Sequence, residues 1–310
     1  MKPAIFVAFR LPPELEALQD GSFDVHLGHG NLPALEPTKR EQVRGLVTNG
    51  IRGAEKALID YFPQLEIIAS LGIGLDALDL VAARARGLVV TNTPGVIADD
   101  AADLAMALLI DRRRQLTRAN RFVVAGQWRN GPFPLARSLT GMTLGIVGLG
   151  AIGSAVARRA EAFRIRVKWH GPRPKPDVPY EYVADLEQLA RESDALVVTC
   201  AGGPATRHLI GAPVLAALGP DGILINIARG SIVDTDALIA ALRGGQIAAA
   251  ALDVFEKQPE VPQELLAMEN VLLTPHLGTA TRETRARMGS MVIESLNEHF
   301  AGRSPRHRVA

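Results

Sequence analysis

The sequence has almost no cysteine and no surplus of positive charge. Cys200 is the one cysteine in 310 residues, so the chain cannot form an internal disulfide, which is typical of a protein from a reducing compartment. The 34 lysines and arginines nearly balance the 33 aspartates and glutamates. This balance argues against nonspecific binding of nucleic acid or of an anionic membrane. We therefore expect a cytoplasmic protein whose binding partner is a small molecule.

Long apolar segments are also missing. The apolar run near the amino end stops at Arg10, Pro12 and Pro13 and is too short for a signal peptide. The longest apolar helix candidate, residues 101–110, contains Asp103 and falls well short of the ~20 residues that cross a membrane. We expect no membrane span, and we assign no metal ligands.

The length and the 47% hydrophobic content predict two cores, because single cores rarely grow beyond roughly 250 to 300 residues. The first part of the chain alternates short β-rich runs (residues 4–9, 45–49 and 66–70) with helical stretches, which favours a parallel α/β sheet. A turn at residues 91–95 is followed by a long helix from about Asp99. We expect its arginine-rich end to form a solvated or dimer-facing surface rather than a phosphate or nucleic-acid patch.

A second α/β series begins near Met142. Its expected strands are apolar and often β-branched, which indicates a sheet covered on both faces, and they occupy residues 143–148, 166–169, 195–200, 222–227, 246–254 and 270–275. An amphipathic helix at residues 279–300 is expected to return to the first domain. We therefore predict a substrate domain formed by residues 1–96 and 279–310, and a dinucleotide-binding domain at residues 97–278. Residues 302–310 form a basic tail with no packing signal.

A glycine-rich turn follows the first strand of the second series. In the sequence GLGAIG, Gly148 can make the tight turn, Gly150 lets a pyrophosphate approach the backbone, and Gly153 allows close helix packing. The N–H groups at the start of the next helix would face the phosphates. The alternative is a strand-to-helix turn without a ligand. The residues predicted to contact a dinucleotide here are Gly148, Leu149, Gly150, Ala151, Ile152 and Gly153.

The end of the next strand decides which dinucleotide is expected. A ribose-binding acid normally lies about 20 residues after the glycine turn, but residues 169–175 contain no carboxylate. Gly171 stands where an acid would repel a 2′-phosphate, and Arg173 and Lys175 are close by. The sequence therefore favours NADP(H), with NAD(H) possible. The alternative is that this basic turn is simply solvated.

Several blocks, in one order, resemble the D-isomer-specific 2-hydroxyacid dehydrogenases, in particular their glyoxylate and hydroxypyruvate (or hydroxyphenylpyruvate) reductase branch. These blocks are LGIGLDALDL, VVTNTPGVIADDAADLAMALL, GLGAIGSAVARRAEAF, GPDGILINIARGSIVDTDALIAAL, ALDVFEKQP and TPHLGTATRETRARM. The resemblance implies two Rossmann-like domains with parallel sheets, a discontinuous and flavodoxin-like substrate domain, an active site in the cleft, and a homodimer.

The resemblance also implies roles for single residues. Arg229 would bind the carboxylate and ketone oxygen of the substrate, and His276 would be the general acid. Leu71 would shape the substrate pocket, and the backbone N–H groups of Ile73 and Gly74 would form a second carboxylate anchor. Each motif alone also fits an ordinary turn or a capped loop. The remaining predicted cofactor contacts are Gly171, Arg173, Lys175, Cys200, Thr206, Ile227, Ala228, Asp253 and Gly278.

One position departs from the family pattern. Most relatives have a glutamate 29 positions after the arginine, which pairs with the histidine, whereas this chain has Gln258. Glu256 is two positions away, and we do not expect it to take the place of that acid. We expect the Gln258 oxygen to accept the imidazole N–H without adding charge, so that His276 holds its proton less firmly.

The function predicted from these features is NADPH-dependent reduction of small 2-keto acids, such as glyoxylate or hydroxypyruvate, to D-2-hydroxy acids by direct hydride transfer. One alternative is a non-enzymatic, dinucleotide-sensing interaction protein of the same family. A third possibility, a formate-type dehydrogenase, is suggested only by Gln258.

Overall fold

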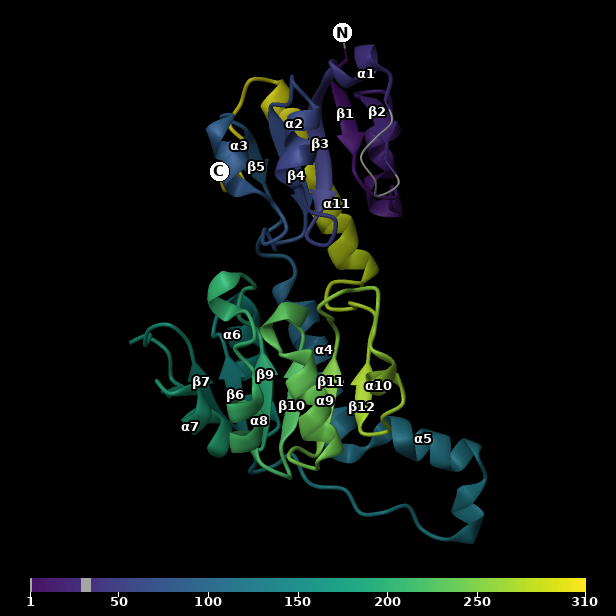
Figure 1. Cartoon of the computed structure of the whole chain (residues 1–310), viewed down its shortest axis with the longest axis vertical. Coiled ribbons are helices and arrows are strands. Elements are labelled where there is room, and N and C mark those ends of the chain that lie inside the picture. The colour runs from purple at the N-terminus through teal and green to yellow at the C-terminus, as the bar shows by residue number, and fades with distance from the viewer. Residues whose placement is uncertain (1, 29–34) are drawn as a thin grey trace. The chain divides into compact units, whose positions relative to one another are not determined.

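The computed structural model describes residues 2–28 and 35–310. The chain divides into two compact units, which Figure 1 shows. Unit 1 comprises Met1–Val96 and Thr281–Ala310, and unit 2 comprises Ile97–Ala280. The chain thus leaves unit 1 once and returns to it through its last helix. The roles predicted for the two domains are not decided by these bounds.

Unit 1 is built on a parallel sheet in the order β2-β1-β3-β4-β5 among the described residues. This is the flavodoxin-like strand order, as predicted. The edge strand β2 was not predicted, because it is only partly buried and lacks an apolar pattern. The elements are β1 (Ala4–Val7), η1 (Pro13–Gln19), β2 (Asp24–Leu27), α1 (Pro37–Arg40), β3 (Val43–Asn49), α2 (Lys56–Tyr61), β4 (Ile67–Leu71), α3 (Leu80–Ala85), β5 (Val89–Thr91) and α11 (Arg282–Phe300).

The carboxyl-terminal tail corrects one prediction. Residues 302–310 were expected to have no packing partner, but the tail runs back along β5. The N–H of Val309 donates to the Val90 carbonyl at 2.7 Å, and the N–H of Val90 donates to Ala310 at 2.9 Å. An antiparallel bridge joins Thr91 to Arg308. Backbone groups make these bonds, so side-chain composition gave no signal for them.

Unit 2 contains a parallel sheet in the order β12-β11-β10-β9-β6-β7-β8 among the described residues. Its elements are α4 (Ala98–Arg114), α5 (Leu116–Val124), η2 (Gln127–Asn130), β6 (Thr143–Val147), α6 (Ala151–Ala162), β7 (Arg166–His170), β8 (Glu181–Tyr182), α7 (Leu186–Arg191), β9 (Ala195–Val198), η3 (Pro204–Thr206), α8 (Ala212–Leu218), β10 (Ile223–Asn226), η4 (Gly230–Ile232), α9 (Thr235–Arg243), β11 (Ala249–Leu252), α10 (Gln263–Leu266) and β12 (Val271–Leu273).

The sheet of unit 2 separates two apolar cores. Along β9, Val197 packs with α4 and α6, whereas its neighbours Leu196 and Val198 pack with α7, α8 and α9. Because side chains alternate between the faces of a strand, each central strand must be apolar on both faces. This explains the continuous apolar runs in the sequence. It also leaves the carboxyl ends of the strands as the place where polar side chains can emerge together.

The arginine-rich end of α4 differs from the prediction. Arg113 is 8% exposed and donates to the Ser138 carbonyl at 3.0 Å, and Arg112 pairs with Asp111. These two arginines are therefore packed within unit 2, and the prediction of a solvated or dimer-facing surface is wrong for them. The α4 helix ends at Arg114, and the C-cap residue Gln115 has a left-handed φ of 55°.

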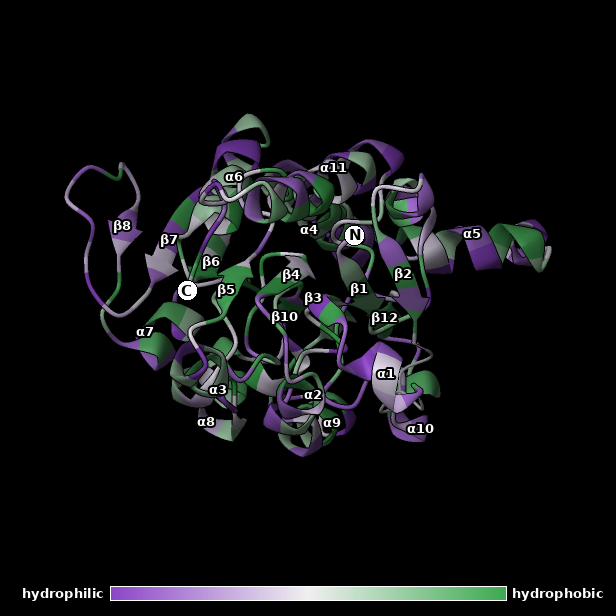
Figure 2. Cartoon of the chain, turned by 90° about the horizontal axis from the view of Figure 1, so that it is seen from above, coloured by the Kyte–Doolittle hydropathy of each residue, from purple (hydrophilic) through white to green (hydrophobic). Residues whose placement is uncertain are grey.

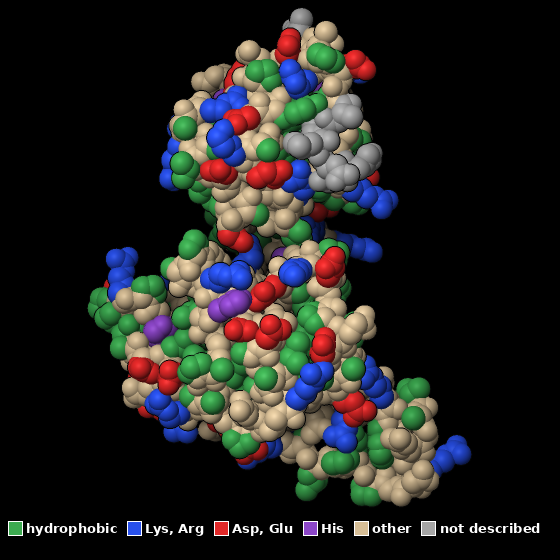
Figure 3. All heavy atoms as spheres, viewed as in Figure 1, with side chains coloured by type: hydrophobic (Ala, Val, Ile, Leu, Met, Phe, Trp, Pro, Cys, Tyr) green, Lys and Arg blue, Asp and Glu red, His purple; other side chains and the backbone are tan. Residues whose placement is uncertain are grey.

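Beyond this break, α5 and the segment after it project from the body of unit 2, with apolar and polar faces (Figures 1 and 2). We call residues 116–135 the arm. Apolar side chains gather at its surface in Figure 3, and those most exposed are Leu116, Val123, Val124, Trp128 and Leu135. Among the described helices, none has the length and apolar character needed to span a membrane.

Candidate active site

The glycine turn lies between β6 and α6, at the carboxyl edge of the sheet of unit 2. Gly148 has a positive φ of 97°, and a Cβ on it would come within 2.6 Å of Cys200. A Cβ on Gly153 would lie 2.3 Å from the Gly148 carbonyl. Gly150 is exposed, and a Cβ on it would meet nothing within 4 Å. Two of the glycines are thus required by the protein's own packing, whereas the third leaves open space.

The start of α6 faces the same open space. Gly150 is its N-cap residue and makes no side-chain cap, so the first N–H groups of this 12-residue helix have no side-chain acceptor from the cap position. An anion is stabilised at such an end by the free donors and by the helix dipole. The turn therefore fits a pyrophosphate.

The basic turn after β7 approaches the glycine turn. The Nζ of Lys175 donates to the carbonyl of Leu149 at 2.5 Å, 26 residues away in sequence. Arg173 is exposed, and the carbonyl of Gly171 accepts a hydrogen bond from the Tyr182 hydroxyl at 2.9 Å. The structure thus brings two of the predicted cofactor residues, Leu149 and Lys175, into direct contact.

Arg229 lies in the turn between β10 and η4. Asn226, at the end of β10, shapes this turn: its Nδ2 donates to the Arg229 carbonyl at 2.9 Å, and its Oδ1 accepts from the Ala228 N–H at 3.0 Å. The Nη1 of Arg229 donates to the Ala228 carbonyl at 2.7 Å. Gly230 packs so closely on the next loop that a Cβ would lie 2.0 Å from the carbonyl carbon of Phe255. We call residues 226–230 the Arg229 turn.

His276 lies in the loop after β12, and Asp253 holds that loop. The carboxylate of Asp253 is fully buried and accepts hydrogen bonds from Thr274 Oγ1 at 2.6 Å, Leu277 N–H at 2.7 Å and Gly278 N–H at 2.9 Å. The backbone carbonyl of Asp253 accepts the His276 N–H at 3.0 Å. His276 itself has a left-handed φ of 57°, which is uncommon for a residue other than glycine. Asp253, predicted to contact the cofactor, here positions the histidine loop.

Gln258 contacts His276 directly, at 3.0 Å between Nε2 of the amide and Nδ1 of the ring. The Phe255 N–H lies 3.4 Å from the amide oxygen, which sets this orientation of the side chain. The contact pairs the two predicted residues, with the amide nitrogen nearer the ring. The role expected for the amide oxygen, accepting the imidazole N–H, stays a prediction.

Other predicted cofactor residues lie along the same edge of the sheet. Cys200 follows β9 and touches Gly148, and burial raises the pKa of its thiol to about 11. The thiol is therefore neutral near pH 7 and is not an activated nucleophile. Thr206, in η3, donates its hydroxyl to the Ala201 carbonyl at 2.8 Å. Ile227 and Ala228 are buried beside Arg229, and Gly278 is buried against Asp253.

The predicted substrate contacts in unit 1 form one turn after β4. Leu71 ends that strand and is buried, whereas Ile73 is 41% exposed. The turn is fixed by Asn92 Nδ2, which donates to the Ile73 carbonyl at 3.1 Å, and by Thr93 Oγ1, which accepts the Gly72 N–H at 3.0 Å. These bonds do not use the N–H groups of Ile73 and Gly74. The substrate-binding role of Leu71, Ile73 and Gly74 stays a prediction.

The prediction from sequence missed His208 and Asn226. The ring of His208 contacts the carboxylate of Glu256, with Nε2 2.9 Å from Oε1. Asn226 gave a weak signal, since it stands three residues before Arg229 at the end of an apolar strand. His208 gave none, because its partner is 48 residues away. Among the described residues, no group of histidine, cysteine, aspartate and glutamate could hold a metal ion.

The parts assembled at this edge are an anion cradle at a helix start, a guanidinium, and an imidazole oriented by an amide. Together with the parallel α/β fold, they define the class of pyridine-nucleotide-dependent dehydrogenases.

Comparison with known proteins defines the family. The model of the D-isomer specific 2-hydroxyacid dehydrogenase NAD-binding domain matches residues 106–278. The chain is 45% identical over 267 residues to a glyoxylate/hydroxypyruvate reductase A of Arabidopsis thaliana, covering 86% of this chain and 85% of the relative. It is also 45% identical over 263 residues to a hydroxyphenylpyruvate reductase of Plectranthus scutellarioides, covering 85% and 84%.

A solved structure agrees with this result. An NADPH-dependent glyoxylate/hydroxypyruvate reductase from Sinorhizobium meliloti, in complex with NADP and malonate, matches with a TM-score of 0.94 and 39% identity over 100% of this chain and 97% of that chain. The chain therefore belongs to the D-isomer-specific 2-hydroxyacid dehydrogenase family, as the sequence motifs indicated, and is an NAD(P)-dependent enzyme of that family.

The open space at Gly150 gives a direct test of the cradle. We expect Gly150→Val to fold with a melting temperature close to that of the wild type, because the added Cβ meets no protein atom within 4 Å. We expect it to weaken NADPH binding by at least about tenfold, because the side chain fills the pyrophosphate space. The measurement is the rise in melting temperature with increasing NADPH. Gly153→Ala is the contrasting control and should lower the melting temperature without ligand. An unchanged NADPH response in Gly150→Val would exclude this cradle.

Proposed function

We propose that the protein reduces small 2-keto acids such as glyoxylate or hydroxypyruvate to D-2-hydroxy acids with NADPH. The observation that carries this proposal is the joined set of contacts at the carboxyl edge of the unit 2 sheet: Gly230 packs on Phe255, and Gln258 contacts His276. The segment 255–258 thereby contacts both the Arg229 turn and His276, which lies in the loop after β12. The names of the relatives in plants and in Sinorhizobium support the substrate class.

The reaction needs one hydride and one proton. When bound, the reduced nicotinamide supplies the hydride to the carbonyl carbon. The guanidinium of Arg229 would bind the substrate carboxylate and carbonyl oxygen through its planar N–H groups. The protonated ring of His276 would give its Nε2 proton to the oxygen as negative charge develops there. Ile73 and Gly74 keep their predicted role as carboxylate anchors.

Gln258 would serve both protonation states of His276. With its amide nitrogen towards the ring, as in the structure, it would donate to Nδ1 of a neutral ring. A protonated ring carries a proton on Nδ1 and needs an acceptor there instead. Rotation about the last side-chain torsion, which is soft, turns the amide oxygen towards the ring. This rotation gives up the 3.4 Å contact with the Phe255 N–H and replaces the Nε2 contact with the ring by an oxygen contact.

Steady-state reduction of a panel of 2-keto acids, followed by loss of the reduced-nicotinamide absorbance, tests the function. We expect turnover with glyoxylate or hydroxypyruvate, and a fall of kcat/KM by at least ~100-fold in His276→Gln and in Arg229→Gln. Arg243→Gln, at the exposed end of α9, is the control for loss of a charge. NADPH binding without turnover of any keto acid would favour the dinucleotide-sensing alternative, and turnover of formate alone would favour the formate-type alternative.

The second proposal within this function is a preference for NADPH over NADH. Arg173 is exposed, so we expect Arg173→Ser to lower kcat/KM for NADPH by roughly 10- to 100-fold, the worth of one charge-assisted hydrogen bond, with little change for NADH. Lys175→Ser should affect both cofactors, because Lys175 also holds the Leu149 carbonyl. Arg166→Ser, at the other end of β7, is the matched control. A higher kcat/KM for NADH in the wild type would contradict the preference.

The amide at position 258 predicts an unusual pH profile. A carboxylate within about 4 to 6 Å favours the protonated ring and raises its pKa by ~1 to 3 units, and Gln258 lacks that charge. Reduction requires the protonated ring, so we expect Gln258→Glu to move the alkaline limb of kcat/KM to higher pH by about 1 unit or more. Oxidation of the hydroxy acid requires the neutral ring and should begin at higher pH in the variant. An unmoved alkaline limb would refute the charge effect.

We also propose that the protein forms a homodimer in the cytoplasm. The exposed apolar side chains of the arm, among them Val124, Trp128 and Leu135, support a partner for this surface. Light scattering after size-exclusion chromatography should give twice the chain mass of 33.1 kDa, and Val124→Glu combined with Trp128→Glu should shift it towards a single chain. A wild-type protein of 33.1 kDa would contradict the dimer.

A further inference from the structure

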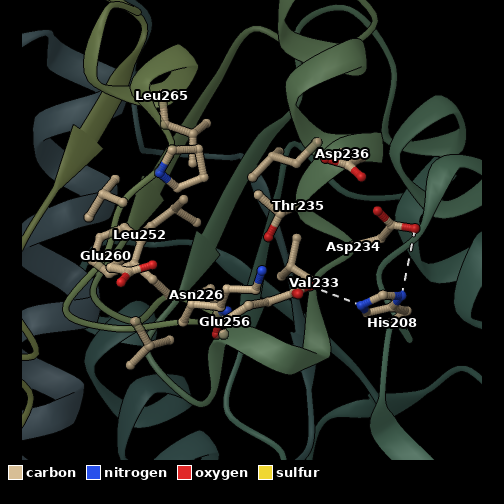
Figure 4. Close-up of a pocket in the computed structure, with 17 residues that line it drawn as sticks. His208, Asn226, Val233, Asp234, Thr235, Asp236, Leu252, Glu256, Glu260 and Leu265 are labelled. Carbon is tan, nitrogen blue, oxygen red and sulfur yellow. Dashed lines mark hydrogen bonds and ion pairs between the residues drawn. The ribbon is translucent and has the colours of Figure 1, made fainter.

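Behind the Arg229 turn, unit 2 contains a cavity of about 330 Å³. Its walls include Gly230 from that turn and Phe255 from the loop after β11. Figure 4 labels further lining residues, among them Glu256 from the same loop and Thr235 and Asp236 at the start of α9. The cavity is therefore lined by the Arg229 turn and the loop that carries Gln258, but not by the side chains of Gln258 and His276. His208 stands at its edge.

The backbone of His208 is tied to the chain just after Arg229. Its N–H donates to the Ser231 carbonyl at 2.8 Å, and two residues later the Ile210 N–H donates to the Ile232 carbonyl at 2.9 Å. The Asp234 N–H returns a bond to Ile210 at 3.0 Å. His208 has a left-handed φ of 51°. A strained conformation of this kind persists only where neighbouring bonds fix it.

The side chain of His208 contacts a different segment, the loop that carries Gln258. Its Nε2 lies 2.9 Å from the carboxylate of Glu256, and its Nδ1 lies 3.8 Å from that of Asp234 (Figure 4). An ionised carboxylate only accepts hydrogen bonds, so the ring donates from Nε2. Asp234 is itself fixed, because it caps α9 by accepting the Ala237 N–H at 3.0 Å.

Two further contacts carry the position of this loop to His276. Glu256 and Phe255 pack on Gly230 at a distance that no other residue at position 230 would permit. The Phe255 N–H then meets the oxygen of Gln258 at 3.4 Å, and the amide nitrogen of Gln258 meets His276 at 3.0 Å. One continuous series of contacts therefore runs from His208 to the imidazole of His276.

We propose that His208 is a positioning residue that clamps residues 255–258 against the Arg229 turn and so fixes Gln258 against His276. The proposal deepens the proposed function and rests on it for its kinetic consequences. An exposed ion pair elsewhere would matter little. Here the pair ties the loop that carries Gln258 to a segment bonded to the chain just after Arg229. A displacement of about 1 Å in a reacting group can cost ~100-fold in rate.

The test compares His208→Leu with His208→Gln. Both replacements meet the same backbone strain, but the amide nitrogen of glutamine still reaches Glu256, so their difference isolates the hydrogen bond. We expect His208→Leu to lower kcat by at least about tenfold, with KM for NADPH unchanged within about twofold, since the glycine turn is not part of the clamp. His208→Gln should retain most of the wild-type kcat.

Two comparisons separate positioning from a general loss of structure. Asp194→Leu is the matched control: Asp194 pairs with Arg113 and accepts the Thr143 N–H at 2.9 Å, at the opposite edge of the same sheet. It should lower the melting temperature without the loss of kcat. In a Gln258→Leu background, His208→Leu should change kcat by less than about twofold, because the group it positions is already gone. Equal losses in both backgrounds, or a similar loss in Asp194→Leu, would overturn the proposal.

A readout without turnover distinguishes failure of the clamp from failure of the proposed function. Long-range ¹H–¹⁵N spectra report both ring nitrogens of each histidine, and His276→Gln assigns the signals of His276. We expect His208→Leu to shift these signals and His208→Gln and Asp194→Leu to leave them in place. If the wild type reduces no keto acid but the signals shift, the clamp stands and the function fails. Unshifted signals in His208→Leu would overturn the clamp.

Discussion

The buried carboxylate of Asp253 is the interaction on which the site depends. A buried charge is tolerated only when its acceptor positions are filled, and this one is filled by the Thr274 hydroxyl and the N–H groups of Leu277 and Gly278. Each of these donors belongs to the loop that carries His276. Loss of one donor would leave charge unsatisfied inside the protein, at a cost of several kcal/mol. The end of β11 thus dictates the conformation of a loop that comes more than twenty residues later.

The two neighbouring polar side chains, Glu256 and Gln258, are divided between two histidines. Because the chain turns at residues 256–259, these two side chains face different partners: Glu256 contacts His208, whereas Gln258 contacts His276. The carboxylate is therefore already engaged and does not replace the missing acid at position 258. In this chain the carboxylate of Glu256 thus joins two loops through His208, whereas the neutral amide of Gln258 contacts His276, the proposed general acid.

The parts that the sequence could predict are those that depend on local patterns. Apolar β-branched runs marked the central strands because both faces of the sheet are covered, and Gly148 and Gly153 were recognisable because their own backbone requires them. Contacts between distant residues left no such mark. The Lys175 bond to Leu149, the burial of Arg113 and the bond between Val309 and Val90 all depend on tertiary packing. The orientation of the Gln258 amide depends on a contact with the Phe255 N–H, a backbone group that leaves no mark in a sequence.

Both histidines of the site region adopt a left-handed backbone, which costs an L-residue roughly 1 to 2 kcal/mol. His276 is held in it by the Asp253 carbonyl and His208 by the Ser231 carbonyl. Bonds within unit 2 thus fix both strained positions. The imidazole of His276 would then already be oriented before substrate binds. Binding would not have to order this side chain, which would otherwise lower the affinity. For this reason the groups that fix the loops are as much a part of the site as those that would touch the substrate.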